Sequence, residues 1–194
     1  MAINYPLTLP TATGVRSIEL QASNAVAISR SPFTFASQVH AYSGQMWSAS
    51  LTLPPMKLTA ARQWTAWLTS LRGQYGSFLL GDTSCCQISG TATSASVTGV
   101  AGDNTVTVTS NGTILAGDMI QIGSASDATL HKVLADQSGN GSLEIWPALR
   151  KVRTAAALTL TNAKGAFRLA SNEVSWSVDE ANIYGVSFSA VEKI

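Results

Sequence analysis

The sequence predicts a mainly β fold in which one small β domain interrupts another. Residues 45–53 alternate apolar and polar side chains, and residues 60–72 follow a helical pattern. The Ser/Thr/Gly-rich stretch from residue 83 to residue 164 then shows its own succession of short strands. A chain of 194 residues suffices for one large or two small domains. We therefore expect a sandwich-forming domain from residues 1–82 plus 165–194, and a small β domain, barrel or sandwich, from residues 83–164.

The first outer segment predicts two strands. Residues 17–29 alternate loosely, which is typical of a half-buried strand. A turn region containing Phe33 and Phe35 follows. Residues 45–53 alternate more clearly, with Trp47 and its i+2 neighbours on one face, and the strand is expected to stop at two prolines.

One helix is expected at residues 59–72. Thr59 is a suitable N-cap residue, and Trp64, Trp67, Leu68 and Leu71 recur with helical spacing. Gly73 and Gly76 are expected to end the helix. The tryptophans are interpreted as the face that packs on a sheet, because an apolar stripe at helical spacing is usually a buried face.

The second outer segment predicts strands that close the same domain. Residues 173–178 and 184–190 alternate and should pair antiparallel, since a turn separates them. Trp176 and Phe188 are expected to be partners in the core. Because these strands share a domain with residues 45–53, the two ends of the inserted segment should lie close together.

Within residues 83–164, about six short strands follow one another at intervals of roughly 8–13 residues, which is typical of a small barrel or sandwich. No helical pattern occurs there. Four aspartates stand beside turn residues, where a carboxylate usually accepts hydrogen bonds from the local backbone: Asp103, Asp118, Asp127 and Asp136.

Composition excludes several classes of function. Charged residues make up 12% of the chain, against about 25% in an average soluble domain. Either a Ser/Thr-rich β surface or coverage by copies and partners accounts for this value. The net charge is +1, and the only basic cluster is Arg150, Lys151 and Arg153, so we expect no nucleic-acid-binding face. We also expect no membrane span and no secretory signal.

No catalytic, cofactor-binding or metal-binding set is expected. His40, placed before a strand, and His131, at the start of one, have no acid or nucleophile motif beside them. Cys85 and Cys86 are adjacent, which disfavours a disulfide between them, and no histidine stands near enough to complete a zinc site. We interpret them as reduced thiols of a protein made in a cytosol.

Trp146 is the one candidate ligand-binding residue. It lies at the end of a strand in the inserted segment, beside Arg150. An exposed tryptophan in a small β barrel is able to stack on a sugar ring, and the alternative is a core tryptophan.

The outer segments resemble tail proteins of long-tailed bacteriophages and related prophages, most of all the distal tail protein. The resemblance covers a little over half the chain and is carried by these stretches: GQMWSASLTLPPM (44–56), WTAWLTSLRGQYGSFLLGD (64–82), GAFRLA (165–170), WSVDE (176–180) and YGVSFSAVE (184–192). The inserted segment has no diagnostic sequence of its own.

This resemblance implies a tail-tube-like β-sandwich with one flanking helix, interrupted by an OB-like or galectin-like barrel. It implies a non-enzymatic virion protein, assembled in the host cytoplasm, that forms a hexameric ring joining the tail tube to the tip or baseplate. The expected partners are further copies of itself, the tail tube protein, the tail-tip or hub protein, the tape measure protein and a host-surface glycan. Two alternatives are a carbohydrate- or receptor-binding module and a tail-associated hydrolase that uses His40 and His131.

Overall fold

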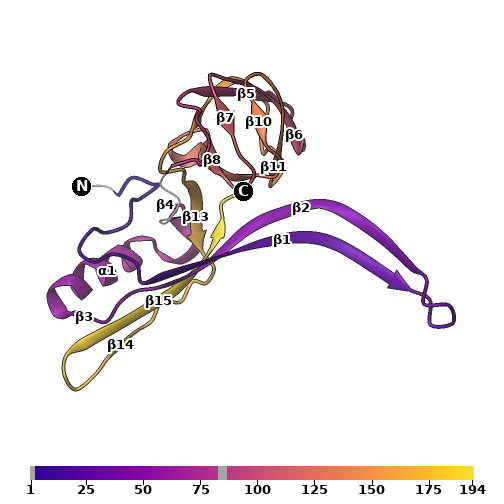
Figure 1. Ribbon diagram of the computed structural model, residues 1–194. Helices are drawn as coiled ribbons and strands as arrows, with labels where there is room; N and C mark the ends of the chain where they lie inside the picture. Colours follow the sequence, from indigo (N-terminus) through magenta and orange to yellow (C-terminus); the bar gives the residue numbers. More distant parts are fainter. Residues whose placement is uncertain (1–2, 83–86) are drawn as a thin grey trace.

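The structure is a computed structural model that describes residues 3–82 and 87–194. In these ranges it contains one α helix, a seven-stranded sheet and a closed six-stranded barrel (Figure 1). The predicted fold class, mainly β with one flanking helix and an inserted small barrel, is confirmed.

The sheet combines both outer segments of the chain, in the order β1-β2-β15-β13-β4, with β3 and β14 also pairing with β15. Its strands are β1 (Ser17–Arg30), β2 (Ser37–Thr52), β3 (Met56–Lys57), β4 (Phe78–Leu80), β13 (Gly165–Leu169), β14 (Trp176–Val178) and β15 (Ile183–Glu192). The long C-terminal strand β15 joins them, since β2 pairs antiparallel with one of its edges while β13 and β14 pair with the other. The expected antiparallel pairing of the last two strands is therefore confirmed.

The barrel is built from strands within residues 95–159, in the order β11-β6-β5-β12-β8-β9. These are β5 (Ala95–Gly99), β6 (Thr105–Ser110), β8 (Met119–Ile122), β9 (Thr129–Val133), β11 (Gly141–Trp146) and β12 (Arg153–Thr159), while β7 (Thr113–Ile114) and β10 (Gln137–Ser138) form a separate two-stranded ladder. Inward-facing residues such as Val97, Val108, Ile120 and Leu143 are fully buried. Side chains alternate between the inside and the outside along each strand, and the inward ones fill the interior of the barrel. Because the sheet closes on itself, the barrel strands have no open edges.

Helix α1 (Leu58–Ser70) covers one face of the sheet. Trp64 is fully buried, and its ring centroid lies 6.4 Å from that of Phe188. Trp67 lies 5.1 Å from Phe78 and 5.8 Å from Phe188 in the same way. Each indole N–H also has a partner, the Thr13 hydroxyl for Trp64 and the Thr8 carbonyl for Trp67. The interpretation of the two tryptophans as a buried helix face is confirmed.

The expected N-cap at Thr59 is wrong. The helix begins one residue earlier, its N-cap position is Lys57, and no side chain caps it. Strand β3 leads directly into the helix, which places Thr59 inside the first turn instead of before it. At the other end Arg72 and Gly73 adopt left-handed φ values of 53° and 68° and end the helix where the glycine predicted it.

We expect Thr59→Ala to leave the free energy of unfolding within about 0.5 kcal/mol of the wild type, because no cap is lost and alanine has the higher helix propensity. Urea unfolding measures this difference. A destabilisation of about 1 kcal/mol or more, typical of a removed cap, would show that Thr59 does cap the helix.

Strands β1 and β2 extend well beyond the sheet as a two-stranded arm (Figure 1). Residues 21–30 and 37–44 are exposed throughout, so the expected half-buried strand holds only for the start of β1. His40 lies inside β2, not before it. The arm is exposed because β15 pairs with β2 only from Ser48 to Thr52, and no other strand extends the sheet beside it in the described ranges.

The expected core pair of Trp176 and Phe188 is also wrong. Strand β14 has only three residues, and Trp176 pairs with Val186 near the end of the sheet that lies opposite the arm. Phe188 is buried under α1, whereas Trp176 remains 43% exposed because the core ends before it.

Candidate assembly surface

The arm, defined as residues 25–44, has one apolar and one polar face. Cross-strand partners point to the same side of a hairpin, and the apolar face pairs Val26 with Ala41 and Ile28 with Val39. The opposite face pairs Ala27 with His40 and Ser29 with Gln38. After the pair of Asn24 and Gln45, the next pair lies two positions further in β1 and four positions further in β2, so the apolar face continues the core face of the sheet.

The apolar face of the arm is open to solvent. Val26 is 48% exposed, Ile28 68% and Val39 60%. An isolated two-stranded hairpin is marginally stable in water, and a contiguous exposed apolar face usually marks an interaction site. The arm is therefore the strongest candidate for a surface that another molecule covers.

The tip of the arm is held in shape by local hydrogen bonds. The Ser31 hydroxyl accepts from the backbone N–H groups of Phe33 and Thr34, and Ser31 itself donates to the Ala36 carbonyl at 2.9 Å. This loop presents Phe33, 91% exposed, and Phe35, 70% exposed. Two aromatic side chains on a hydrogen-bonded loop offer a large contact area at low entropic cost.

Replacing residues 25–44 by Asn-Gly, which joins the paired residues Asn24 and Gln45 through a two-residue turn, should preserve the folded body. We expect a free energy of unfolding within about 1 kcal/mol of the wild type, because the removed side chains are exposed. Urea unfolding and far-UV circular dichroism measure this. Loss of folding would mean that the arm contributes to the core.

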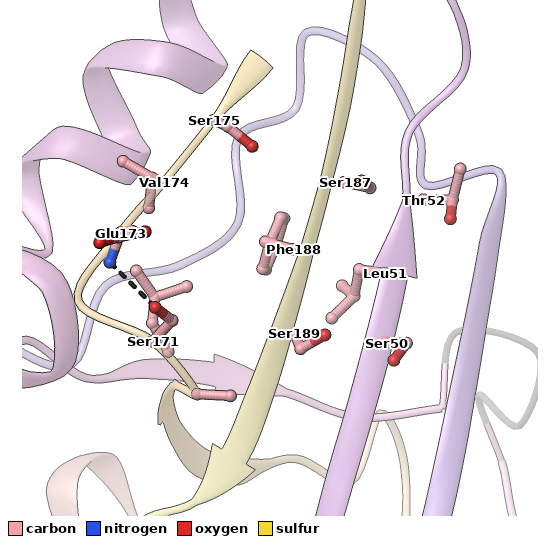
Figure 2. A pocket seen from close by; sticks show the side chains of 12 residues that line it. Ser50, Leu51, Thr52, Ser171, Glu173, Val174, Ser175, Ser187, Phe188 and Ser189 are labelled. Atoms are coloured by element: carbon pink, nitrogen blue, oxygen red, sulfur yellow. Dashed lines mark hydrogen bonds between the residues drawn. The ribbon is translucent and has the colours of Figure 1, made fainter. Parts of the chain in front are cut away.

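The face of the sheet opposite α1 carries short hydroxyl side chains. Ser50 lies beside Ser189, and Thr52 lies beside Ser187. A pocket of ≈ 400 Å³ opens here between these strands and residues 171–175 (Figure 2). Its twelve lining residues include serines, one threonine and the Glu173 carboxylate, but no His, Lys or Cys. The serines therefore have no histidine or lysine beside them, and Glu173 contacts Ser171 through its backbone N–H instead of its carboxylate.

Trp146 faces the base of the arm. Its ring meets that of Trp47 edge-on at 4.6 Å, and its Nε1 donates to the Asn24 side chain at 2.7 Å. Stacking on a ligand stays a prediction, but the indole already has two partners within the protein.

A second set of contacts fixes the barrel to the sheet. The Arg150 guanidinium donates to both carboxylate oxygens of Glu192, from Nη2 at 2.7 Å and from Nε at 3.2 Å, and to the Gln45 carbonyl. Glu192 also accepts from the backbone N–H of Trp47, whose indole donates to the Leu130 carbonyl of the barrel. Sequence reasoning found the basic cluster but missed its partner, since Glu192 lies 42 positions from Arg150.

The structure brings the histidines to very different places. His40 is exposed on the arm beside Tyr42, with ring centroids 4.7 Å apart. His131 is fully buried, with Nδ1 2.8 Å from the Pro147 carbonyl and Nε2 2.9 Å from the Thr129 hydroxyl. Burial lowers the pKa of His131 to about 4, aided by Arg150 and Arg153. It is a neutral structural residue near pH 7, out of reach of a substrate.

Two of the four aspartates confirm the predicted turn role, since Asp103 accepts from the Val100 N–H and Asp118 from the Leu115 N–H, each three residues away. Asp136 instead accepts from the backbone N–H of Ala116, 20 positions away, and so joins two distant segments. The prediction is wrong for Asp127, which forms ion pairs with Lys151 and Arg153, both at 2.6 Å. The hydrogen bond from Lys151 lowers the pKa of this carboxyl despite partial desolvation.

In residues 3–82 and 87–194 no three His, Cys, Asp or Glu side chains gather closely enough to hold a metal ion. Across the same residues no helix has the length and apolar character needed to cross a membrane. The interpretation of Cys85 and Cys86 as reduced thiols falls outside the described residues.

No protein-family model matches the chain, and no curated protein matches it.

Proposed function

We propose that this chain is a structural virion protein that forms a hexameric ring at the distal end of a phage tail, where it joins the tail tube to the tip. The observation that supports this most is the arm, whose apolar face is exposed in a single copy. A subunit built to bury that face against a neighbour explains both the arm and the low surface charge.

The rest of the architecture is consistent with such a subunit. Helix α1 braces one face of the sheet, while the opposite face presents hydroxyl groups with the carboxylates of Glu19 and Glu173 near them. As the wall of the channel through the ring, this hydroxyl-rich face would be hydrated and would not bind tightly to a molecule that passes through the channel. The Arg150–Glu192 contact holds the barrel in a fixed position on the subunit.

The proposed role is not enzymatic. The pocket on the sheet contains no histidine, lysine or cysteine, and His131 is inaccessible. A glycan-binding role was motivated by Trp146, whose ring and N–H are engaged by Trp47 and Asn24, so we do not propose it for the barrel.

Light scattering on the purified protein, alone and mixed with its tail tube protein, tests the proposal. We expect a particle of six times the 20.3 kDa chain mass that binds the end of the tube. A persistent monomer that never associates with the tube would refute it.

A further inference from the structure

We infer that the arm of one copy docks on the β14–β15 hairpin of the next copy. This hairpin, residues 173–186, lies at the opposite end of the sheet from the arm (Figure 1). The inference rests on the proposed function and names the two surfaces through which copies would associate.

Both surfaces expose apolar side chains with the same strand spacing. On the arm, Ile28 is 68% exposed and stands two residues from Val26. On the β14–β15 hairpin, Trp176 is 43% exposed and Val178 49%, and the two share one face because their cross-strand partners are Val186 and Tyr184. Two twisted two-stranded ribbons with apolar faces pack well face to face.

The charges of the two surfaces are complementary. Arg30 is the only Lys, Arg, Asp or Glu in the arm, and its pairing with Ser37 puts it on the apolar face. The paired strands and turn of the β14–β15 hairpin carry Asp179 and Glu180 and no Lys or Arg. Opposite charges at the rim of an apolar contact fix its register and disfavour arm-to-arm pairing, which would bring two arginines together.

The dimensions of the arm also suit this contact. At about 3.3 Å per residue, one strand of the arm reaches roughly 20 Å beyond the sheet. Its residues 25–44 approach the roughly 20–30 residues that a standard interface takes from each partner. Because arm and hairpin are different surfaces at opposite ends, the contact is heterologous, the type that closes into a ring by rotation.

Substitutions on the two faces of the arm provide a matched test of the contact. Ile28→Asp places a charge on the apolar face, and Ser29→Asp places the same charge on the adjacent residue of the polar face. By light scattering over a concentration series, Ile28→Asp should weaken association roughly tenfold or more, while Ser29→Asp should not. Unchanged urea unfolding of both variants would show that the body of the protein is intact.

Charge reversal tests the register. Arg30→Glu should weaken association, and adding Glu180→Arg should restore it. Glu180 is preferred to Asp179 for this test because Asp179 Oδ1 accepts from the backbone N–H of Ile183 and holds the turn.

Mixed cysteine variants identify the partner surface directly. With Cys85 and Cys86 replaced by serine, Ile28→Cys protein mixed with Trp176→Cys protein should give a disulfide-linked dimer under oxidation, and Ser29→Cys should not. An oligomer that survives Ile28→Asp and yields no such cross-link would overturn this inference while leaving the proposed function in place. A protein that stays monomeric at every concentration would refute the proposed function itself.

Discussion

Substituting Glu192 by Gln should destabilise the protein by about 3 kcal/mol. The Glu192 side chain is 2% exposed and that of Arg150 is 15% exposed, so removing the carboxylate charge leaves a largely buried guanidinium without its counter-charge. Breaking a buried ion pair from one side typically costs about 3–5 kcal/mol, and we expect the lower end because water reaches part of Arg150. Urea unfolding measures the loss.

Two controls separate an unpaired buried charge from a general effect of substitution. Lys151→Met removes one partner of an exposed pair, with side chains 66% and 34% exposed, and should change stability by less than about 1 kcal/mol. Replacing both buried partners, Arg150→Met with Glu192→Leu, should recover much of the loss, since no charge is then stranded. A Glu192→Gln protein as stable as the wild type would contradict the proposed role of this contact in fixing the barrel.

Stability should also fall by about 3 kcal/mol between pH 7 and pH 4 because of His131. Burial lowers the pKa of this imidazole from 6.5 to about 4 in the folded state. The unfolded chain therefore binds a proton near pH 6.5 while the folded chain does not, and the stabilisation present above pH 6.5 is lost as the pH falls toward 4.

The measurement is a series of urea unfolding curves between pH 7 and pH 4, for the wild type and for His131→Gln. The variant cannot titrate at this position, and its stability should change much less across the same range. The lowered pKa of Asp127 affects stability only near and below the ordinary carboxyl value of 3.8, so it adds little there. Equal slopes for both proteins would show that His131 is not held neutral.

Much of the fold was predictable because its periodicity reflects burial. The Trp64/Trp67 stripe and the short alternating strands of the barrel both correspond to faces that are buried in the structure. The cap of α1 was less predictable, since Thr59 has the chemistry of an N-cap and only the direct transition from β3 displaces it.

The arm shows why the candidate assembly surface could not be predicted. Ile18 and Leu20 lie over the core, Val26 and Ile28 lie in solvent, and the same alternation runs through all four. Alternation reports that a face is apolar but not which molecule covers it. Trp176 failed as a core prediction for the same reason, since it continues the pattern of a buried face beyond the end of the core.

A cryo-EM map of phage tails assembled in cells that produce this chain tests the central claim most directly. We expect six copies in a closed ring at the distal end of the tube, with the arm of each copy lying on the β14–β15 hairpin of its neighbour. A tail that lacks the chain, or that contains it as isolated copies with solvent-exposed arms, would contradict the claim.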